Sequence, residues 1–250
     1  MTIAPGVVIT GGAGDIGLAV AERLLRNGAS VTVLDNRDPA DAEARLAGPR
    51  RLGPVGYLRV DVRDHEAVAA ALATVPRIDV VVGNAAIVRA APFLDVTPQQ
   101  WRDQLDVNLT GCFNVGQAAA RLMVERARPG RILFTSSWVY DVPWPEISAY
   151  AVAKAGLDML TRCMAAELAG HGILVNAVAP GIVDAGMARR QLQTEPQYAA
   201  RASRSIPLGR LQTPEQVAGA VAFLCSADAD YMTGSTLLVD GGCTVGRFTT

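Results

Sequence analysis

Lysine is the scarcest basic residue of this 250-residue chain, because Lys154 is the single lysine among the 23 lysine and arginine residues. Histidine is almost as rare, with only His65 and His171, so a mechanism based on histidine acid/base chemistry has little material. The cysteines form no CxxC pair and have no nearby histidine, so we expect no metal site and interpret them as small buried hydrophobes. They are Cys112, Cys163, Cys225 and Cys243.

Long apolar runs and a surplus of basic charge are also missing. No stretch approaches the roughly 20 apolar residues that a membrane-spanning helix needs, and no basic segment precedes an apolar run at the amino terminus. The formal net charge of -1 gives no electrostatic reason to expect nucleic acid or an anionic membrane as a partner. We therefore expect a cytoplasmic protein that binds neither nucleic acid nor membranes.

The hydrophobic pattern predicts an α/β fold. Short apolar runs alternate with amphipathic stretches, as in βαβ units that build a parallel sheet. Seven strands are expected, at Gly6–Thr10, Ser30–Asp35, Tyr57–Asp61, Asp79–Asn84, Arg131–Ser136, Leu174–Ala179 and Thr236–Asp240. The most clearly marked helices are expected at Asp15–Asn27, about Gln99–Arg128 and about Tyr150–Ala169. No repeat, low-complexity tract or linker marks a boundary, so residues 1–250 are interpreted as a single domain.

A glycine-rich turn, TGGAGDIG at residues 10–17, lies between the first expected strand and the first expected helix. Glycines allow a tight turn and a close backbone approach to a pyrophosphate, although an ordinary strand-to-helix turn would look similar. Asp35 ends the second strand about 20 residues further on, where a carboxylate can bind an adenosine ribose and repel a 2′-phosphate. The turn has no basic residue, so NAD is expected and NADP is less favoured, although Arg37 lies nearby.

A second chemical pattern consists of Tyr150 and Lys154, with Ser137 and Asn108 upstream. The spacing of four residues places the phenol and the ammonium on one face of a helix. A nearby positive charge stabilises a phenolate, so Tyr150 could exchange a proton with an alcohol. Taken singly, each of the four residues also has an ordinary structural explanation.

Together, these patterns resemble the short-chain dehydrogenase/reductase family over essentially the whole chain. The family motifs are matched by Thr10, Gly11 and Gly17 in the turn, Asp61-Val62, Asn84-Ala85-Ala86, Asn108 in DVNLTG, and Tyr150 and Lys154 in YAVAK. Later matches are Pro180-Gly181, PLGR at 207–210 and TGSTLLVDGG at 233–242. The resemblance implies a Rossmann-like, doubly wound, parallel seven-stranded sheet with helices on both faces. It also implies that the dinucleotide is bound by Gly11, Gly14, Asp15, Ile16, Gly17, Asp35, Asp61, Val62, Asn84, Ala85, Tyr150, Lys154, Pro180, Gly181 and Val183.

Two residues depart from the family pattern. Asp15 stands at the position of the middle glycine of the turn, and we expect it to cap the following helix, with its carboxylate directed away from the phosphate. Ala185 stands where the family usually has a threonine that binds the nicotinamide carboxamide. Val183, Pro180 and Gly181 remain candidates for positioning that ring.

The resemblance further implies hydride transfer between a nicotinamide and the carbon of a secondary alcohol or ketone. Tyr150 would act as base in oxidation and acid in reduction, and Ser137 would bind the substrate oxygen. Lys154 would support the tyrosine and hold the nicotinamide ribose, and Asn108 would anchor a water that relays the proton. A homo-oligomer, most often a tetramer, is implied as well, with the long helices around Asn108 and Tyr150 as interface candidates.

The segment between Ser137 and Tyr150 is expected to line the substrate pocket. Trp138, Trp144 and Glu146 suit apolar and hydroxyl contacts, although the tryptophans could equally pack the loop against the core. Asp141 is an alternative partner for hydroxyls. Val88, Arg89 and residues 185–202, with Met187 among them, are expected to close the pocket. Four arginines could hold an anionic substrate, but the polar face of a mobile helical lid is favoured for Arg189, Arg190, Arg201 and Arg204.

Three functions are therefore compared. The favoured one is an NAD-dependent dehydrogenase of a small polyol, sugar or other secondary alcohol. The second, a 3-oxoacyl-[acyl-carrier-protein] reductase, usually prefers NADPH and needs a basic patch, for which Arg126, Arg128 and Arg131 are candidates. The third is a non-catalytic NAD-binding sensor or scaffold, which has no chemical need for the set of Ser137, Tyr150 and Lys154.

Overall fold

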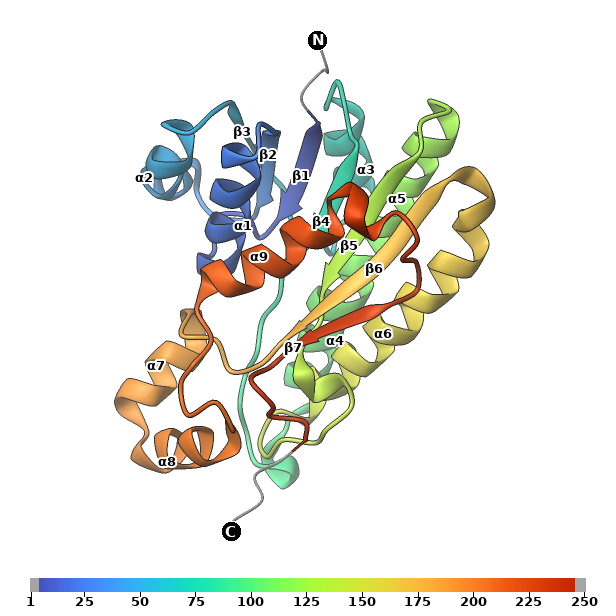
Figure 1. Ribbon diagram of the computed structural model, residues 1–250. Helices are drawn as coiled ribbons and strands as arrows, with labels where there is room; N and C mark the ends of the chain where they lie inside the picture. Colours follow the sequence, from blue (N-terminus) through green and yellow to red (C-terminus); the bar gives the residue numbers. More distant parts are fainter. Residues whose placement is uncertain (1–4, 246–250) are drawn as a thin grey trace.

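A seven-stranded parallel sheet with the order β3-β2-β1-β4-β5-β6-β7 forms the centre of the computed structural model (Figure 1). The structure describes residues 5–245, apart from the side chains of Met187 and Ser203. The strands are β1 (Gly6–Thr10), β2 (Ser30–Asp35), β3 (Val55–Arg59), β4 (Val80–Gly83), β5 (Gly130–Thr135), β6 (Ile173–Pro180) and β7 (Thr236–Val239). The strand order reverses between β1 and β4, which is where doubly wound folds bind ligands at the carboxyl ends of their strands. The predicted Rossmann-like fold is confirmed.

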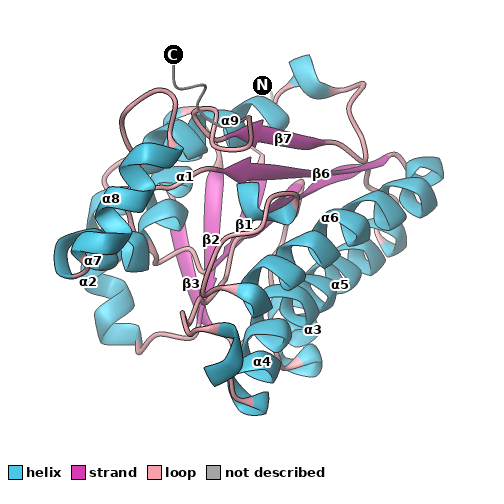
Figure 2. Cartoon of the chain, turned by 90° about the horizontal axis from the view of Figure 1, so that it is seen from below, coloured by secondary structure: helices cyan, strands magenta, loops and turns pink. Residues whose placement is uncertain are grey.

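Helices cover both faces of the sheet (Figure 2). One face carries α1 (Asp15–Arg26), α2 (Pro39–Arg50) and α9 (Pro214–Leu224), and the other carries α3 (His65–Ala73), α4 (Pro98–Leu105), α5 (Gly111–Glu125) and α6 (Ser148–Leu168). Two further helices, α7 (Gly186–Thr194) and α8 (Pro196–Ser205), project beyond the carboxyl ends of the strands (Figure 1). Because they follow β6, they lie near the carboxyl ends of the central strands, where the strand order reverses.

Two apolar layers hold the helices to the sheet. Along β1, Val7 and Ile9 pack toward α1 and α9, whereas Val8 packs toward α5 and α6 with Phe134 and Leu157. Successive residues of a strand point to opposite faces, and both faces are covered here, which explains why β1 is buried throughout.

Most predicted elements agree with the observed ones to within one or two residues at each end. Two differences have a clear physical reason. Strand β3 starts and ends two residues earlier than predicted, because it pairs with β2 from Val55 opposite Val31 to Arg59 opposite Asp35, where β2 ends. The helix predicted at about 99–128 is α4, a π-helical turn at Asp106–Thr110, and α5, which ends at Glu125. Hydrophobic periodicity does not reveal a single wider turn within a long helix.

The cysteines are partly as predicted. Cys112 and Cys243 are buried and Cys225 is half-buried, but Cys163 is exposed, so the prediction of a buried hydrophobe is wrong for Cys163. Burial raises the pKa of Cys225 to about 12, which keeps that thiol protonated at neutral pH. Within residues 5–245 there is no group of three or more histidine, cysteine or acidic side chains that could hold a metal ion. In the same range, every helix is too short or too polar to cross a membrane.

Candidate active site

A cleft of about 640 Å³ lies over the carboxyl ends of the central strands. It brings together most of the predicted site residues, which are Gly11, Gly14, Asp15, Ile16, Gly17, Asp35, Asp61, Val62, Asn84, Ala85, Ser137, Tyr150, Lys154, Pro180, Gly181 and Val183. Four predicted substrate contacts also line it: Arg89, Trp138, Trp144 and Glu146. Asn108 is buried beneath the cleft wall, and the side chain of Met187 lies outside what the structure describes.

The glycine turn is shaped by close backbone contacts. Gly11 adopts a left-handed conformation (φ 61°), and its N–H donates to the Leu34 carbonyl at 2.8 Å. A Cβ atom on Gly17 would lie 2.4 Å from the Gly11 carbonyl oxygen, so the helix can approach the turn only with glycine there. Gly14 caps α1 and provides no side-chain bond, which leaves N–H groups of the first turn for an anion. The turn therefore fits a dinucleotide pyrophosphate.

Asp15 does not cap the helix, so that prediction is wrong. It is already the first helical residue, with Gly14 as the extended N-cap, and its side chain turns toward other elements. Its carboxylate accepts hydrogen bonds from the Gly186 N–H at 2.9 Å and from Arg45 at 2.5 Å, and Arg189 lies 3.6 Å away. The Gly186 N–H and then Arg45 lower the pKa of Asp15, against the effect of burial. Asp15 thus links the glycine turn to α2 and to the start of α7.

At the other end of the turn, Asp35 is held rigidly. Its two carboxylate oxygens accept hydrogen bonds from the backbone N–H groups of Ala13 and Arg37, each at 3.1 Å. The Arg37 side chain lies 3.8 Å from the same carboxylate. Asp61, further along this wall, pairs with Arg63 at 2.6 Å, and these bonds lower its pKa. This end of the cleft, where the resemblance places the adenosine, therefore carries two hydrogen-bonded carboxylates.

The candidate catalytic residues lie where β5 and α6 meet. Tyr150 and Lys154 are one turn apart on α6, and Ser137 follows the end of β5. The Lys154 Nζ atom lies 5.4 Å from the centre of the Tyr150 ring and donates to the Thr135 carbonyl at 2.7 Å. A buried ammonium is costly without such partners, and Lys154 is only 1% exposed. The phenol, the hydroxyl and the ammonium thus border one space.

Asn108 holds the backbone of the segment that borders this space. It lies in the π-helical turn, where its Nδ2 group donates to the Ile87 carbonyl at 2.7 Å and its Oδ1 atom accepts from the Ile87 N–H at 2.8 Å. Both groups of the side chain are therefore used to fix the segment after β4, which lines the cleft. The implied water relay stays a prediction.

At the nicotinamide end expected from the resemblance, the chain leaves β6 through Pro180 and Gly181. A Cβ atom on Gly181 would lie 2.6 Å from the Asp240 carbonyl oxygen, so glycine is required for the close contact with the residue that follows β7. Val183 forms a bridge with Gln212, and Ala185 caps α7 with a methyl group only. This end of the cleft is shaped by backbone rather than by a threonine hydroxyl.

The far end of the cleft is aromatic. Trp138 and Trp144 contact each other edge to face, with ring centres 5.1 Å apart. Trp138 is buried in the small core at this end, and both tryptophans line the cleft. Their contact with a substrate stays a prediction. The Arg201 guanidinium lies 5.0 Å from the Trp144 ring centre and 5.8 Å from that of Tyr198.

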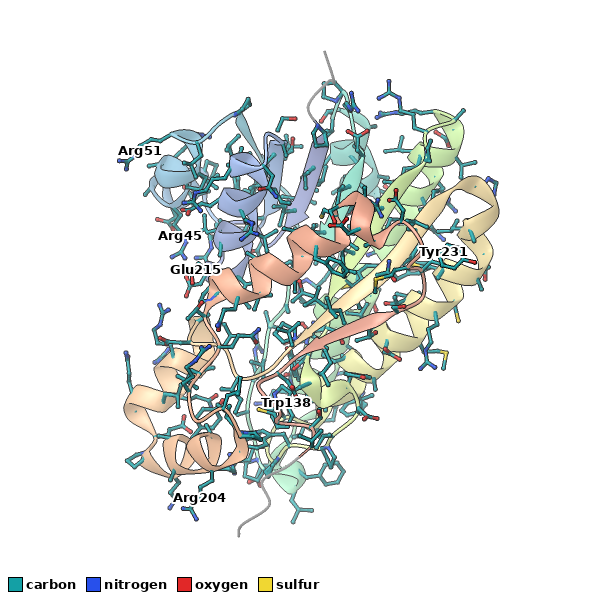
Figure 3. The ribbon with its side chains drawn as sticks, viewed as in Figure 1. Arg45, Arg51, Trp138, Arg204, Glu215 and Tyr231 are labelled. Carbon is teal, nitrogen blue, oxygen red and sulfur yellow. The ribbon has the colours of Figure 1, made fainter. Side chains whose placement is uncertain are left out.

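The four arginines expected on one lid face differ in position. Arg201 lines the cleft and pairs with Glu146 at 3.1 Å, whereas Arg189 pairs with Asp184 at 2.9 Å and lies near Asp15. Arg190 and Arg204 are exposed outside the cleft, and Figure 3 shows Arg204 extending outward from α8. The prediction of one uniform polar face is therefore wrong for Arg201.

Sequence reasoning missed several residues of the site. Thr135 holds Lys154 through its backbone carbonyl, which leaves no trace in the choice of side chain. Tyr198 lines the cleft, and its pKa is raised by burial. The amphipathic pattern of its helix was the only indication in the sequence, and that pattern does not show that the Tyr198 ring faces the cleft. Arg45 reaches the glycine turn from α2, where it resembles any surface arginine.

The same architecture recurs in known proteins. A family model described as Enoyl-(Acyl carrier protein) reductase matches residues 11–244. The chain is 36% identical to 3beta-hydroxysteroid dehydrogenase 1 of Eggerthella lenta over 244 residues, which cover 96% of this chain and 93% of that protein. It is also 36% identical to D-erythrulose reductase of Gallus gallus, over 94% of both proteins.

Solved structures agree with this relationship. A gluconate 5-dehydrogenase from Burkholderia cenocepacia, in complex with NADP and tartrate, has a TM-score of 0.90 to this chain at 34% identity. The comparison covers 97% of this chain and 96% of that one. The chain therefore belongs to the short-chain dehydrogenase/reductase family and is an NAD(P)-dependent oxidoreductase that acts on CH–OH groups.

Proposed function

We propose that this protein is an NAD-dependent dehydrogenase that interconverts a secondary alcohol and a ketone on a small polyol, sugar or other hydroxylated substrate. The observation that carries the proposal is the position of Ser137, Tyr150 and Lys154 on the same cleft as the glycine turn. The cleft extends from the dinucleotide turn to an aromatic end and provides room for a small substrate beside Tyr150.

The roles of the residues follow from their chemistry. Bound NAD would supply the hydride acceptor in oxidation. Tyr150 takes the hydroxyl proton in that direction and returns it in reduction, while Ser137 donates a hydrogen bond to the substrate oxygen. Lys154 stabilises the phenolate electrostatically from the next turn of α6 and holds the nicotinamide ribose. Asn108 fixes the wall after β4 and, as the family resemblance implies, anchors a water for proton relay.

NAD is proposed over NADP because the buried carboxylate of Asp35 stands at the adenosine end, where a 2′-phosphate would meet its charge. The related gluconate 5-dehydrogenase structure contains NADP, so the preference needs a direct test. Fluorescence titration with NADH and NADPH should give tighter binding of NADH, and equal or tighter binding of NADPH would contradict the proposal.

Turnover should then be followed by NADH absorbance with a panel of polyols, sugars, other secondary alcohols and their ketones. Reaction with secondary alcohols or ketones would support the proposal. Cofactor binding without turnover of any of them would favour the non-catalytic sensor instead.

The 3-oxoacyl-[acyl-carrier-protein] reductase is the second candidate, because the chain is also 36% identical to an enzyme of that name from Vibrio harveyi, over 94% of this chain. The structure weakens its expected basic patch: Arg126 donates to the backbone carbonyl of Val75, and Arg131 pairs with Asp230.

We further propose that the whole chain acts as one dinucleotide-binding domain, assembles as a homotetramer and works in the cytoplasm.

A further inference from the structure

We propose that Glu146 and Arg201 form a charge-balanced clamp that binds neighbouring hydroxyl groups of an uncharged substrate and selects against hydroxy acids. The inference rests on the dehydrogenase function proposed above and names the substrate class of that same site. Glu146 and Arg201 would be specificity-determining residues rather than catalytic ones.

The clamp is built from two segments that meet across the cleft. Glu146 belongs to the loop between Ser137 and Tyr150, and Arg201 belongs to α8; the two side chains pair at 3.1 Å, and both line the cleft. The pair joins Arg201 Nη2 to Glu146 Oε2. The second carboxylate oxygen can accept a hydrogen bond from a ligand, and the Nη1 group can donate one. Vicinal hydroxyl groups are each donor and acceptor, so they match this adjacent pair.

The backbone and the rings hold the pair in place. Glu146 has a left-handed backbone conformation (φ 70°), which is costly for a residue with a Cβ atom, and its carbonyl accepts from the Ala91 N–H at 2.8 Å. The rings of Trp144 and Tyr198 flank the Arg201 guanidinium. Apolar ring faces beside a few fixed polar groups suit the alternating C–H and O–H groups of a polyol.

The charges of the cleft argue for an uncharged substrate. Each arginine that lines it has a carboxylate partner: Arg37 with Asp35, Arg63 with Asp61, Arg89 with Asp103, and Arg201 with Glu146. The remaining lining cation among residues 5–245 is Lys154, which supports Tyr150. A substrate carboxylate beside Arg201 would meet the charge of Glu146 and gain no unpaired cation, so it should bind poorly.

The test compares substrates that share a carbon skeleton and differ in charge. The wild-type protein is assayed with NAD on a polyol, on the corresponding hydroxy acid and on a simple secondary alcohol without neighbouring hydroxyls. In the reverse direction it is assayed with NADH on the matching keto sugar and keto acid. We expect kcat/KM for the polyol or keto sugar to exceed that for the acid by about tenfold or more. A preference for the acid of that size would overturn the clamp while leaving the dehydrogenase function intact.

Two variants test whether Glu146 and Arg201 determine the preference for the polyol over the acid. Glu146→Gln keeps the shape and removes the negative charge, so the ratio of kcat/KM for acid over polyol should rise by about tenfold. Arg201→Met should raise KM for the polyol by a larger factor than KM for the simple alcohol. Arg204→Gln, on the same helix but outside the cleft, is the matched control and should behave like the wild type. An unchanged ratio in Glu146→Gln would overturn the proposal.

A binding measurement provides a readout that does not depend on turnover. In the NADH complex, the tryptophan fluorescence of the wild type should respond to the polyol at lower concentration than to the acid, and Glu146→Gln should narrow that difference. Tighter binding of the acid would overturn the clamp. If no alcohol or ketone is turned over although the cofactor binds, the proposed function fails, and the clamp fails with it.

Discussion

Lys154 is both the single lysine of the chain and one of its most deeply buried charged side chains. Its ammonium reaches the Thr135 carbonyl at 2.7 Å from a position one turn after Tyr150. An ammonium is a compact charge on a flexible stem, whereas a guanidinium is planar, bulkier and directed differently. The one basic position of this sequence that holds lysine instead of arginine is therefore a position where arginine could not make the same contacts.

Substitution of Lys154 by arginine preserves the formal charge and should still lose most activity. We expect kcat to fall about a hundredfold, equivalent to ~2.7 kcal/mol of barrier, because the guanidinium cannot take the place of the ammonium between Tyr150 and Thr135. The measurement is kcat by NADH absorbance, with exposed Arg121→Lys as the control for the reverse exchange. Wild-type kinetics in the variant would show that a compact ammonium is not needed.

Asp35 is expected to set the choice of cofactor. In Asp35→Asn the shape is kept and the negative charge is lost, so binding of NADPH relative to NADH should improve by about tenfold. Arg37, already beside this side chain, would then face the 2′-phosphate without a competing carboxylate. Parallel fluorescence titrations with NADH and NADPH measure the ratio of the two dissociation constants. An unchanged ratio in Asp35→Asn would show that Asp35 does not determine the cofactor preference.

Among the secondary-structure elements, α7 is tied to the glycine turn through Asp15. Asp15 accepts the N–H of Gly186, the first residue of α7, and also binds Arg45 of α2. We therefore expect a shift at the turn to be transmitted to α7 through this hydrogen bond.

Removal of the Asp15 charge should loosen α7. In Asp15→Asn, we expect faster amide hydrogen exchange in residues 186–194 than in the wild type, with exposed Asp228→Asn as the control. The pKa of Asp15 is lowered, so the tether is complete above the ordinary carboxyl pKa of about 3.9 and is lost as the pH falls through the lower folded value. Protection of α7 should thus be constant near neutral pH, and equal exchange in wild type and Asp15→Asn would contradict the tether.

The strands and the glycine turn could be predicted because their signals are local: short apolar runs and glycine spacing. The end of β3 could not, since it depends on where β2 stops supplying hydrogen bonds. The partner of Asp15 could not be predicted either, because Gly186 lies 171 positions away and contributes only a backbone N–H. The proximity of Tyr150 and Lys154 could be predicted because both lie on one helix. The contact of Arg201 with Glu146 could not, because it depends on the packing of α8 against the loop.

For the whole molecule, exposed apolar side chains on α5 and α6 indicate where copies of the chain would meet. Phe113, Val152 and Met159 are 41%, 48% and 51% exposed on these two helices. Apolar side chains of this size favour burial in an interface. Light scattering should show a homotetramer for the wild type and smaller species for Met159→Glu, with Leu52→Glu on the opposite side as the control. A monomeric wild type would contradict this expectation.

The central claim is that Tyr150 exchanges the proton of a secondary alcohol next to a bound nicotinamide. Tyr150→Phe removes a single oxygen and leaves the ring, the helix and Lys154 in place. Turnover followed by NADH absorbance should fall by about a thousandfold or more, while the dissociation constant for NADH changes by less than about twofold. Turnover within about tenfold of the wild type, with intact cofactor binding, would contradict the account.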